Sequence, residues 1–208
     1  MPSSVNSEDH GKRVAAIVLA AGRSVRMSGV NKLLAPFNGV AMIVHVVRNL
    51  RDSSANPIIV VTGHEQNQIM RALAGEAVGY VHNADYVAGL ASSLRCGLMA
   101  LPPDIDAVLI CLGDMPRVNT THIARLIAAF EPREGREICV PFFRSQRGNP
   151  VLWARRFIPE MMQLSGDAGA RAVLAKHADA VCPVQMDDAG VLLDIDTPED
   201  LAALRRSS

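Results

Sequence analysis

The hydrophobic residues of this chain fall into short, uninterrupted runs. The three clearest are VAAIVLAA at 14–21, IIVVT at 58–62 and AVLICL at 107–112. Strands of a parallel sheet are covered on both faces, so they consist of continuous apolar runs and lack the alternation of a half-exposed strand. We predict that these segments are strands of a parallel sheet, with 107–112 near its centre.

Between these runs, apolar residues recur at helical spacing. The elements predicted over the first two thirds of the chain are strand 14–21, helix 41–50, strand 58–62, helix 66–74, strand 78–82, helix 91–101, strand 107–112 and strand 137–142. A further helix is expected to be capped by Thr120 or Thr121 and to run to Phe130, because a threonine hydroxyl can accept a hydrogen bond from a free backbone N–H. Strands and helices therefore alternate along the chain.

The pattern is less regular in the last third of the chain. No element is predicted for GNPVLW at 148–153, while two short helices are expected within 155–176 and strands at 180–185 and 191–193. The last helix is expected to begin at Thr197, since Pro198 suits the first helical position and Asp200 completes a capping box.

This order of elements predicts the fold class. Alternating strands and helices with short connections are typical of a single-domain, doubly wound α/β fold with a mostly parallel sheet. A length of 208 residues is enough for one substantial core. We expect residues 1–12, which are polar and aperiodic, to be a disordered leader, and 13–208 to form the domain. Ligands of such sheets bind beyond the carboxyl ends of the strands.

Composition excludes several classes of partner. The 21 basic and 21 acidic residues cancel, so no global field attracts nucleic acid or a membrane, and a phosphate site has to be built locally. No run approaches the roughly 18 apolar residues of a membrane span. The run at 14–21 is not expected to be an export signal, because Glu8 and Asp9 precede it. Four widely spaced cysteines are expected to be buried thiols in a cytoplasmic protein: Cys96, Cys111, Cys139 and Cys182.

The loop after the first strand predicts a triphosphate site. Small residues at the carboxyl end of this strand let backbone N–H groups approach an anion, and Arg23, Arg26 and Lys32 add positive charge. Neither G-x-G-x-x-G nor G-x-x-x-x-G-K-[ST] occurs, and an ordinary turn with solvated basic residues is the alternative. The candidate nucleotide-binding residues here are Leu19, Ala20, Ala21, Gly22, Arg23, Ser24 and Lys32.

Asp114 is the strongest candidate metal ligand. It follows the run 107–112 by two residues, at the edge where this architecture places ligands. A carboxylate there can hold Mg²⁺ and offset the charge of a triphosphate, although Asp114 could also close a tight turn before Pro116. Asp194 and Asp196 alternate along an extended stretch, so one of the two faces the site. We favour Asp196 as the second metal ligand, and alternation alone leaves Asp194 open.

Two further loops carry candidate binding residues. In GLASSLR at 89–95, Gly89, Ser92 and Ser93 could contact the polar edge of a base, or the serines could be plain helix caps. The segments around 147–149 and 165–171 gather glycines and polar side chains, and loops of this kind often bind a second substrate. The candidate acceptor-binding residues are Asn149, Gly166, Asp167 and Arg171, with simple connecting turns as the alternative.

Taken in order, these motifs resemble the MobA-like nucleotidyltransferases, and in particular the molybdenum cofactor cytidylyltransferases. The motifs are L-A-A-G-x-S-x-R-M with Lys32, GLASSLR, LGDMP, RGNPVLW, GDAGAR and DIDTPEDL, and the match spans roughly residues 14 to 204. The first motif also occurs in nucleotidyltransferases of sugar and isoprenoid phosphates, whereas the ordered set is narrower. Ser28 departs from the glycine that commonly follows R-M in the family.

The resemblance implies transfer of a nucleoside monophosphate to a phosphate group with release of pyrophosphate. It implies that Gly22, Arg26 and Lys32 hold the triphosphate, that Asp114 and Asp196 bind Mg²⁺, and that Arg26, Lys32 and Asp114 are catalytic. Guanylyl-transferring relatives usually have L-A-G-G at 19–22, so CTP is expected ahead of another NTP, with molybdopterin as the phosphate acceptor and a molybdenum hydroxylase as a possible client. Transfer to a sugar or isoprenoid phosphate, and a nonenzymatic escort of molybdenum cofactor to an apo-oxidoreductase, stay open as alternatives.

Overall fold

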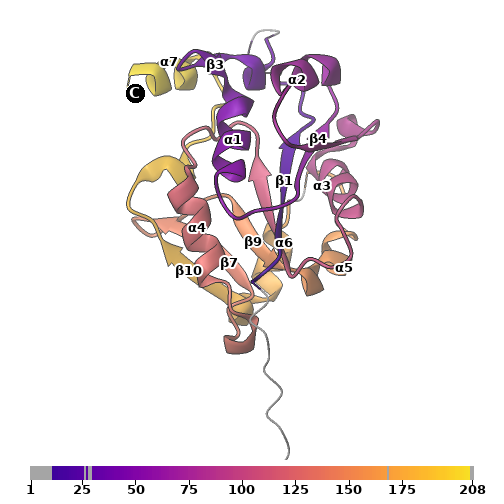
Figure 1. Ribbon diagram of the computed structural model, residues 1–208, viewed down its shortest axis with the longest axis vertical. Coiled ribbons are helices and arrows are strands. Elements are labelled where there is room, and N and C mark those ends of the chain that lie inside the picture. Colours follow the sequence, from indigo (N-terminus) through magenta and orange to yellow (C-terminus); the bar gives the residue numbers. More distant parts are fainter. Residues whose placement is uncertain (1–10, 26, 28–29, 168, 207–208) are drawn as a thin grey trace, which may run out of the picture.

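The computed structural model describes residues 11–25, 27, 30–167 and 169–206 (Figure 1). Most of the predicted leader lies outside these residues, as do Arg26 and Ser28. The strands are β1 (Val14–Ala20), β2 (Pro36–Phe37), β3 (Val40–Ala41), β4 (Ile58–Thr62), β5 (Gly79–His82), β6 (Ala107–Leu112), β7 (Ile138–Phe143), β8 (Gln146–Arg147), β9 (Val151–Ala154) and β10 (Val181–Gln185). The α-helices are α1 (Met42–Arg51), α2 (Gln66–Ala72), α3 (Leu90–Met99), α4 (Thr120–Ala129), α5 (Ile158–Met161), α6 (Arg171–Lys176) and α7 (Pro198–Arg206).

The main sheet has the strand order β10-β7-β9-β6-β1-β4-β5, with β8 paired to β7. Strand β1 is parallel to β4 and β6, and β10 is parallel to β7. The residues of β1 from Ala15 to Val18 are fully buried, as a central strand requires. The single-domain α/β architecture with a mostly parallel sheet is therefore confirmed.

Helices cover both faces of this sheet. Helices α1 and α4 contact each other and lie in front of the sheet in Figure 1, where Val46 and Ile123 pack towards Cys111 of β6. Helices α3 and α6 lie on the opposite face, over Ile110 and Leu112. Alternate residues of β6 thus serve two separate layers.

The sequence-based prediction misses the antiparallel strand β9. It lies within GNPVLW, pairs antiparallel with both β6 and β7, and carries Trp153 opposite Val108. The predicted strand at 191–193 is wrong, because 189–192 form a 3₁₀ turn in which Asp188 accepts a hydrogen bond from Gly190 N at 2.7 Å.

The predicted caps of α4 are also wrong, whereas the start of α7 is confirmed. Asn119 caps α4 by accepting a hydrogen bond from His122 N at 3.0 Å, and Thr120 Oγ1 instead donates to Asn49 O. In α7, Thr197 N donates to Asp200 Oδ2 at 2.8 Å and Asp200 N donates to Thr197 Oγ1 at 3.2 Å.

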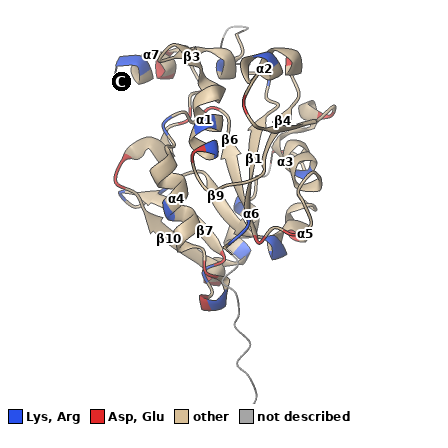
Figure 2. Cartoon of the chain, viewed as in Figure 1, with Lys and Arg blue, Asp and Glu red and all other residues tan. Residues whose placement is uncertain are grey.

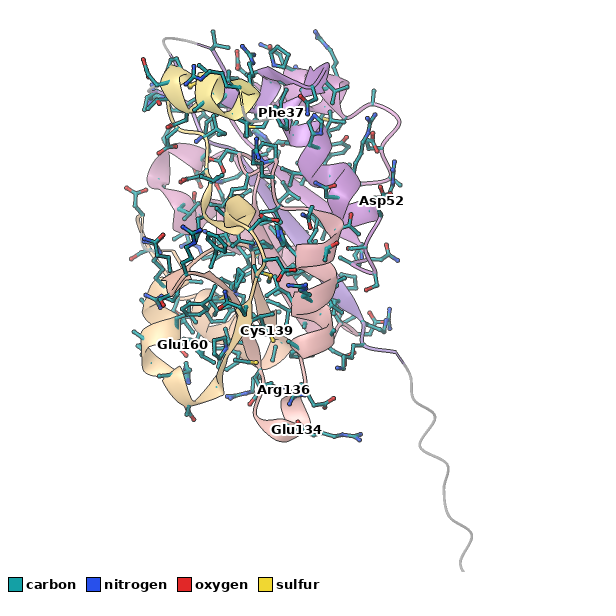
Figure 3. The ribbon with its side chains drawn as sticks, turned by 90° about the vertical axis from the view of Figure 1, so that its left-hand side faces the viewer. Phe37, Asp52, Glu134, Arg136, Cys139 and Glu160 are labelled. Carbon is teal, nitrogen blue, oxygen red and sulfur yellow. The ribbon has the colours of Figure 1, made fainter. Side chains whose placement is uncertain are left out.

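The four cysteines are free thiols, but they are not all buried. Cys111 and Cys139 are buried, and Cys96 and Cys182 are half-buried. Cys139, which is labelled in Figure 3, lies on β7 and is fully buried. Burial raises the pKa of the Cys139 thiol to about 12, so this group is unreactive at neutral pH.

Acidic and basic residues are dispersed over the ribbon without separating into two faces (Figure 2). Among the described residues, none of the helices combines the length and the apolar character that crossing a bilayer demands.

Candidate active site

Three charged side chains from distant parts of the chain meet at the carboxyl end of the sheet. Lys32 Nζ lies 2.5 Å from Asp114 Oδ2 and 2.7 Å from Asp196 Oδ1. Lys32 begins a 3₁₀ turn after the first loop, Asp114 follows β6, and Asp196 precedes α7. Lys32 is thus an ammonium ion held between two carboxylates.

Local hydrogen bonds fix the segment that carries Lys32. Ser24 Oγ accepts from Lys32 N at 3.1 Å, and the buried Asn31 side chain accepts from Leu33 N at 3.1 Å. Ser24 itself has a φ of +50°, a conformation that L-residues seldom adopt. The loop after β1 is therefore folded back on itself, which brings Lys32 towards the end of β6.

Asp196 reaches the site through the packing of α7. An apolar cluster joins this helix to the segments after β1; its buried members are Met27, Ala35, Phe37, Met42, Ile195, Leu201 and Leu204. Figure 3 shows Phe37 next to the end of the molecule that carries α7. Ile195 N also donates to Asp114 O at 3.1 Å, so the backbone beside Asp196 is tied directly to Asp114. The exposed Asp194 makes no such contact with Lys32 among the described interactions.

Burial and the ion pair have opposite effects on the pKa values of Lys32 and Asp114. Burial raises the pKa of the Asp114 carboxyl above its usual value, and the neighbouring Lys32 opposes that rise. For Lys32, burial lowers the pKa, but the two carboxylates outweigh it and hold the pKa above the ordinary value. Lys32 therefore stays protonated at neutral pH.

Asp114 also has an unused oxygen. Its Oδ1 is buried and has no hydrogen-bond partner among the described residues. An unsatisfied buried carboxylate oxygen is costly, and a ligand at this position would relieve that cost. No group of three or more His, Cys, Asp or Glu side chains arranged to hold a metal occurs in the part of the chain that the structure describes. A divalent cation here would need oxygens from a substrate as well.

A cavity of about 280 Å³ opens beside these charges. It is lined by Leu19, Ala21, Gly22, Ser24, Lys32, Leu33, Tyr86, Gly89, Leu90, Ser93, Leu112, Asp114 and Asp167. Most of the candidate nucleotide-binding residues belong to this set. Three do not: Ala20 of β1 and Ser92 of α3 are buried, and Arg23 is exposed to solvent.

The two serines of α3 have structural partners. Asn83 Nδ2 donates to Ser92 Oγ at 2.9 Å and to Ser93 Oγ at 3.0 Å, and Ser92 Oγ lies 2.8 Å from Gly89 O. The N-cap of α3 is Gly89, with a φ of +100°, so the reading of these serines as plain caps is wrong. Asn83 was missed from the sequence, although it follows β5 in the way that Asp114 follows β6.

A second cavity of about 280 Å³ adjoins the first on the α3 face of the sheet. The two share Leu19, Leu90, Leu112 and Asp167. The remaining residues that line it are Leu94, Ile110, Asn149, Val151, Trp153, Gly169, Ala170, Arg171 and Leu174. Three of the four candidate acceptor residues are therefore in its wall. The fourth, Gly166, lies outside the wall, where its carbonyl accepts from Ala91 N at 3.0 Å.

A doubly wound sheet with a folded loop after β1 and an acidic rim opposite defines a nucleotide-binding α/β domain. Residues 16–181 match the MobA-like NTP transferase domain, so the chain belongs to this family, as its motifs predict.

Two relatives align over nearly their whole length. The molybdenum cofactor cytidylyltransferase of Escherichia coli is 28% identical over 88% of this chain and 91% of its own. The nicotine blue oxidoreductase of Paenarthrobacter nicotinovorans is 25% identical over 92% of this chain and 96% of its own. The chain spans about a quarter of the length of the bifunctional GlmU proteins that it matches, such as that of Kineococcus radiotolerans, at 36% identity.

Solved structures agree with this assignment of the fold. A nucleotidyl transferase from Methanothermobacter superposes with a TM-score of 0.83 at 25% identity, over 95% of this chain and 98% of that one. Rv0371c from Mycobacterium tuberculosis superposes with a TM-score of 0.82 at 26% identity, over 94% and 99%. A further structure of Rv0371c is a complex with manganese.

Proposed function

We propose that the protein transfers CMP from CTP to the terminal phosphate of a molybdopterin-type acceptor and releases pyrophosphate. The observation that carries this proposal is the junction of two cavities beside Lys32, Asp114 and Asp196. One cavity has the backbone loop and cation suited to a triphosphate, and the other is largely apolar and borders it. Two substrates bound in this way would meet next to the charged cluster.

The donor set at this cluster fits Mg²⁺. Asp114 Oδ1 is buried and unpartnered, and Asp196 offers a second carboxylate nearby. Magnesium is commonly held by one or two carboxylates together with substrate phosphates. A bound Mg²⁺ would neutralise charge on the triphosphate oxygens. The manganese complex of Rv0371c is consistent with a divalent cation at a site of this fold.

The chain's own residues would act by position and charge. An oxygen of the acceptor phosphate attacks the α-phosphorus of CTP, a new P–O bond forms, and the bond from the α-phosphorus to the bridging oxygen breaks as pyrophosphate leaves. The backbone around Gly22 and Ser24 lines the first cavity and would hold the phosphates. Lys32 would exchange a carboxylate for a phosphate oxygen, since its stem is flexible and its ammonium stays charged. Arg26, which the resemblance makes a further cation on the pyrophosphate, lies outside the described residues.

The second cavity bears on the acceptor. Its walls include six aliphatic side chains and one indole from β6, β9, α3 and α6, which suit a flat heterocycle better than a sugar phosphate rich in hydroxyls. The stretch matched to GlmU covers only about half of this chain. That similarity therefore does not support a sugar phosphate as the acceptor.

The test is pyrophosphate release. Purified protein with Mg²⁺ would be supplied with each of the four nucleoside triphosphates, with and without molybdopterin, and release is expected with CTP and molybdopterin together. Turnover with a sugar or isoprenoid phosphate would favour that alternative. No release in any mixture, with retained binding of molybdenum cofactor, would favour an escort. Because one full-length relative is named an oxidoreductase, oxidation of NADH or NADPH should be followed in parallel.

A further inference from the structure

The wall of the second cavity includes a residue whose polar group has no partner among the described residues. Trp153 lies in this wall, is only 1% exposed, and its indole Nε1 has no hydrogen-bond partner among the described residues. A buried N–H without an acceptor is energetically unfavourable. The other residues of β9 and β6 in this wall, such as Val151 and Ile110, offer no side-chain acceptor.

The register of the sheet places Trp153 at the inner end of the cavity. Trp153 pairs with Val108 of β6, whereas Leu112 of β6 belongs to both cavities at the carboxyl edge. The four steps along the strand from residue 108 to residue 112 span about 13 Å at roughly 3.3 Å per residue. The cavity therefore runs along the face of the sheet from the charged cluster inwards, and it is longer than a single six-membered ring.

Polar residues of this cavity come from other segments. Asn149 precedes β9, and Asp167 and Arg171 belong to the loop before α6 and to its first turn. Asp167 and Arg171 are exposed, in contrast to Trp153. Such a cavity has an apolar floor, one buried donor, and charged groups where solvent reaches it. These features suit a flat, fused-ring heterocycle that carries a ring nitrogen or carbonyl acceptor on one edge and an anionic group on the other.

We propose that Trp153 determines acceptor specificity by donating its indole N–H to the edge of a pterin-like fused heterocycle, whose phosphate-bearing side chain extends past Leu112 towards Lys32 and Asp114. This inference deepens the proposed function and depends on it for the identity of the acceptor. Neighbouring packing keeps the indole fixed, since Phe157 lies edge-on to it with ring centroids 6.0 Å apart. Trp153 is thus pre-oriented before a ligand binds.

The chain offers a direct probe, because Trp153 is its sole tryptophan. Titration with 6-hydroxymethylpterin is expected to change the tryptophan fluorescence emission until it saturates. A parallel titration of free N-acetyltryptophanamide corrects for the light that the pterin itself absorbs. Glucosamine 1-phosphate is expected to leave the emission unchanged. CTP should bind without displacing the pterin, because it occupies the other cavity. An unchanged emission with pterin, or an equal change with the sugar phosphate, would overturn the proposal.

Two variants test the hydrogen bond and the cavity separately. Trp153→Phe keeps an aromatic ring and removes the donor, so calorimetry should show pterin affinity about fivefold to tenfold lower and CTP affinity unchanged. Ala170→Phe adds bulk to a residue that lines the cavity and should abolish pterin binding while CTP still binds. CTP binding also shows that each variant is folded. Equal pterin affinity in Trp153→Phe and the wild type would mean that the indole N–H serves no ligand, and would refute the inference.

Failure of this inference can be told apart from failure of the proposed function. Tryptophan-dependent pterin binding without pyrophosphate release from any mixture would leave the cavity assignment intact and reject the transfer reaction. Conversely, CMP transfer to molybdopterin with an unchanged KM for the acceptor in Trp153→Phe would support the reaction and reject the role of Trp153.

Discussion

Substitution of Asp114 by asparagine tests the centre of the proposed site. The change keeps the shape of the side chain and removes its charge, so Lys32 retains Asp196 at 2.7 Å but loses the carboxylate at 2.5 Å. If Asp114 holds a cation, that cation stabilises the charge that develops in the transition state by several kcal/mol. Loss of the carboxylate should then lower kcat by about 10²- to 10³-fold, at about 1.4 kcal/mol per factor of ten.

Stability should respond far less than activity. Asp114 is buried, and that burial raises its pKa, so the neutral amide avoids the desolvation of a carboxylate while it gives up part of an ion pair. We expect the free energy of unfolding to change by no more than about 1–2 kcal/mol, because these two effects oppose each other. A large loss of activity in a folded protein would therefore report on the chemistry.

The assay is steady-state pyrophosphate release with saturating CTP and acceptor, combined with urea unfolding of both proteins. Asp179→Asn is the matched control, since it makes the same change at an exposed carboxylate before β10 that lines neither cavity. The control should keep kcat within about twofold. Near-normal turnover of Asp114→Asn, or an equal loss in both variants, would refute the assignment of Asp114.

Three further outcomes follow from the structure. Asp196→Asn should lower kcat by about tenfold, which is a smaller loss than that of Asp114→Asn. The reason is that the Asp196 side chain is 38% exposed, whereas that of Asp114 is 14% exposed. Equal losses of pyrophosphate release in the two variants would contradict this order. The pKa of Asp114 is raised, so the folded state binds this proton more tightly than the unfolded state does. The contribution of this group to stability is therefore lost as pH rises from about 3.8 through the folded pKa. The free energy of unfolding in urea should vary less with pH across that range for Asp114→Asn than for the wild type, and parallel profiles would refute the shift. Gly89→Ala should destabilise the fold by about 1–3 kcal/mol, and by more than Gly75→Ala does. Both glycines have positive φ, but a Cβ at Gly89 would lie 2.6 Å from Gly166 O. Equal destabilisation of the two variants in thermal unfolding would contradict the predicted clash.

The parallel core and one edge of the candidate site could be predicted from local pattern along the chain. Continuous apolar runs identified β1, β4 and β6, because a strand that is buried on both faces carries apolar residues at every position. Asp114 could be placed at the rim from its distance along the chain after β6, since parallel strands end at a common edge. The capping box at Thr197 and Asp200 was equally local, and it located the start of α7.

Features that depend on partners far away in the chain could not be predicted in this way. The strand β9 is specified by pairing with β6 and β7, and its short run resembles a loop until those partners are in place. Val191 and Leu192 are apolar in the same way as a strand, but the Asp188 cap folds them into a turn. Asp196 contacts Lys32, and the segment that carries it is held in place by the packing of α7 against Phe37 and Met42. The unpartnered N–H of Trp153 can be recognised only once its surroundings are known. Periodicity along a chain reports how much of a residue is buried, whereas the identity of its neighbours is set by contacts between segments that the fold alone brings together.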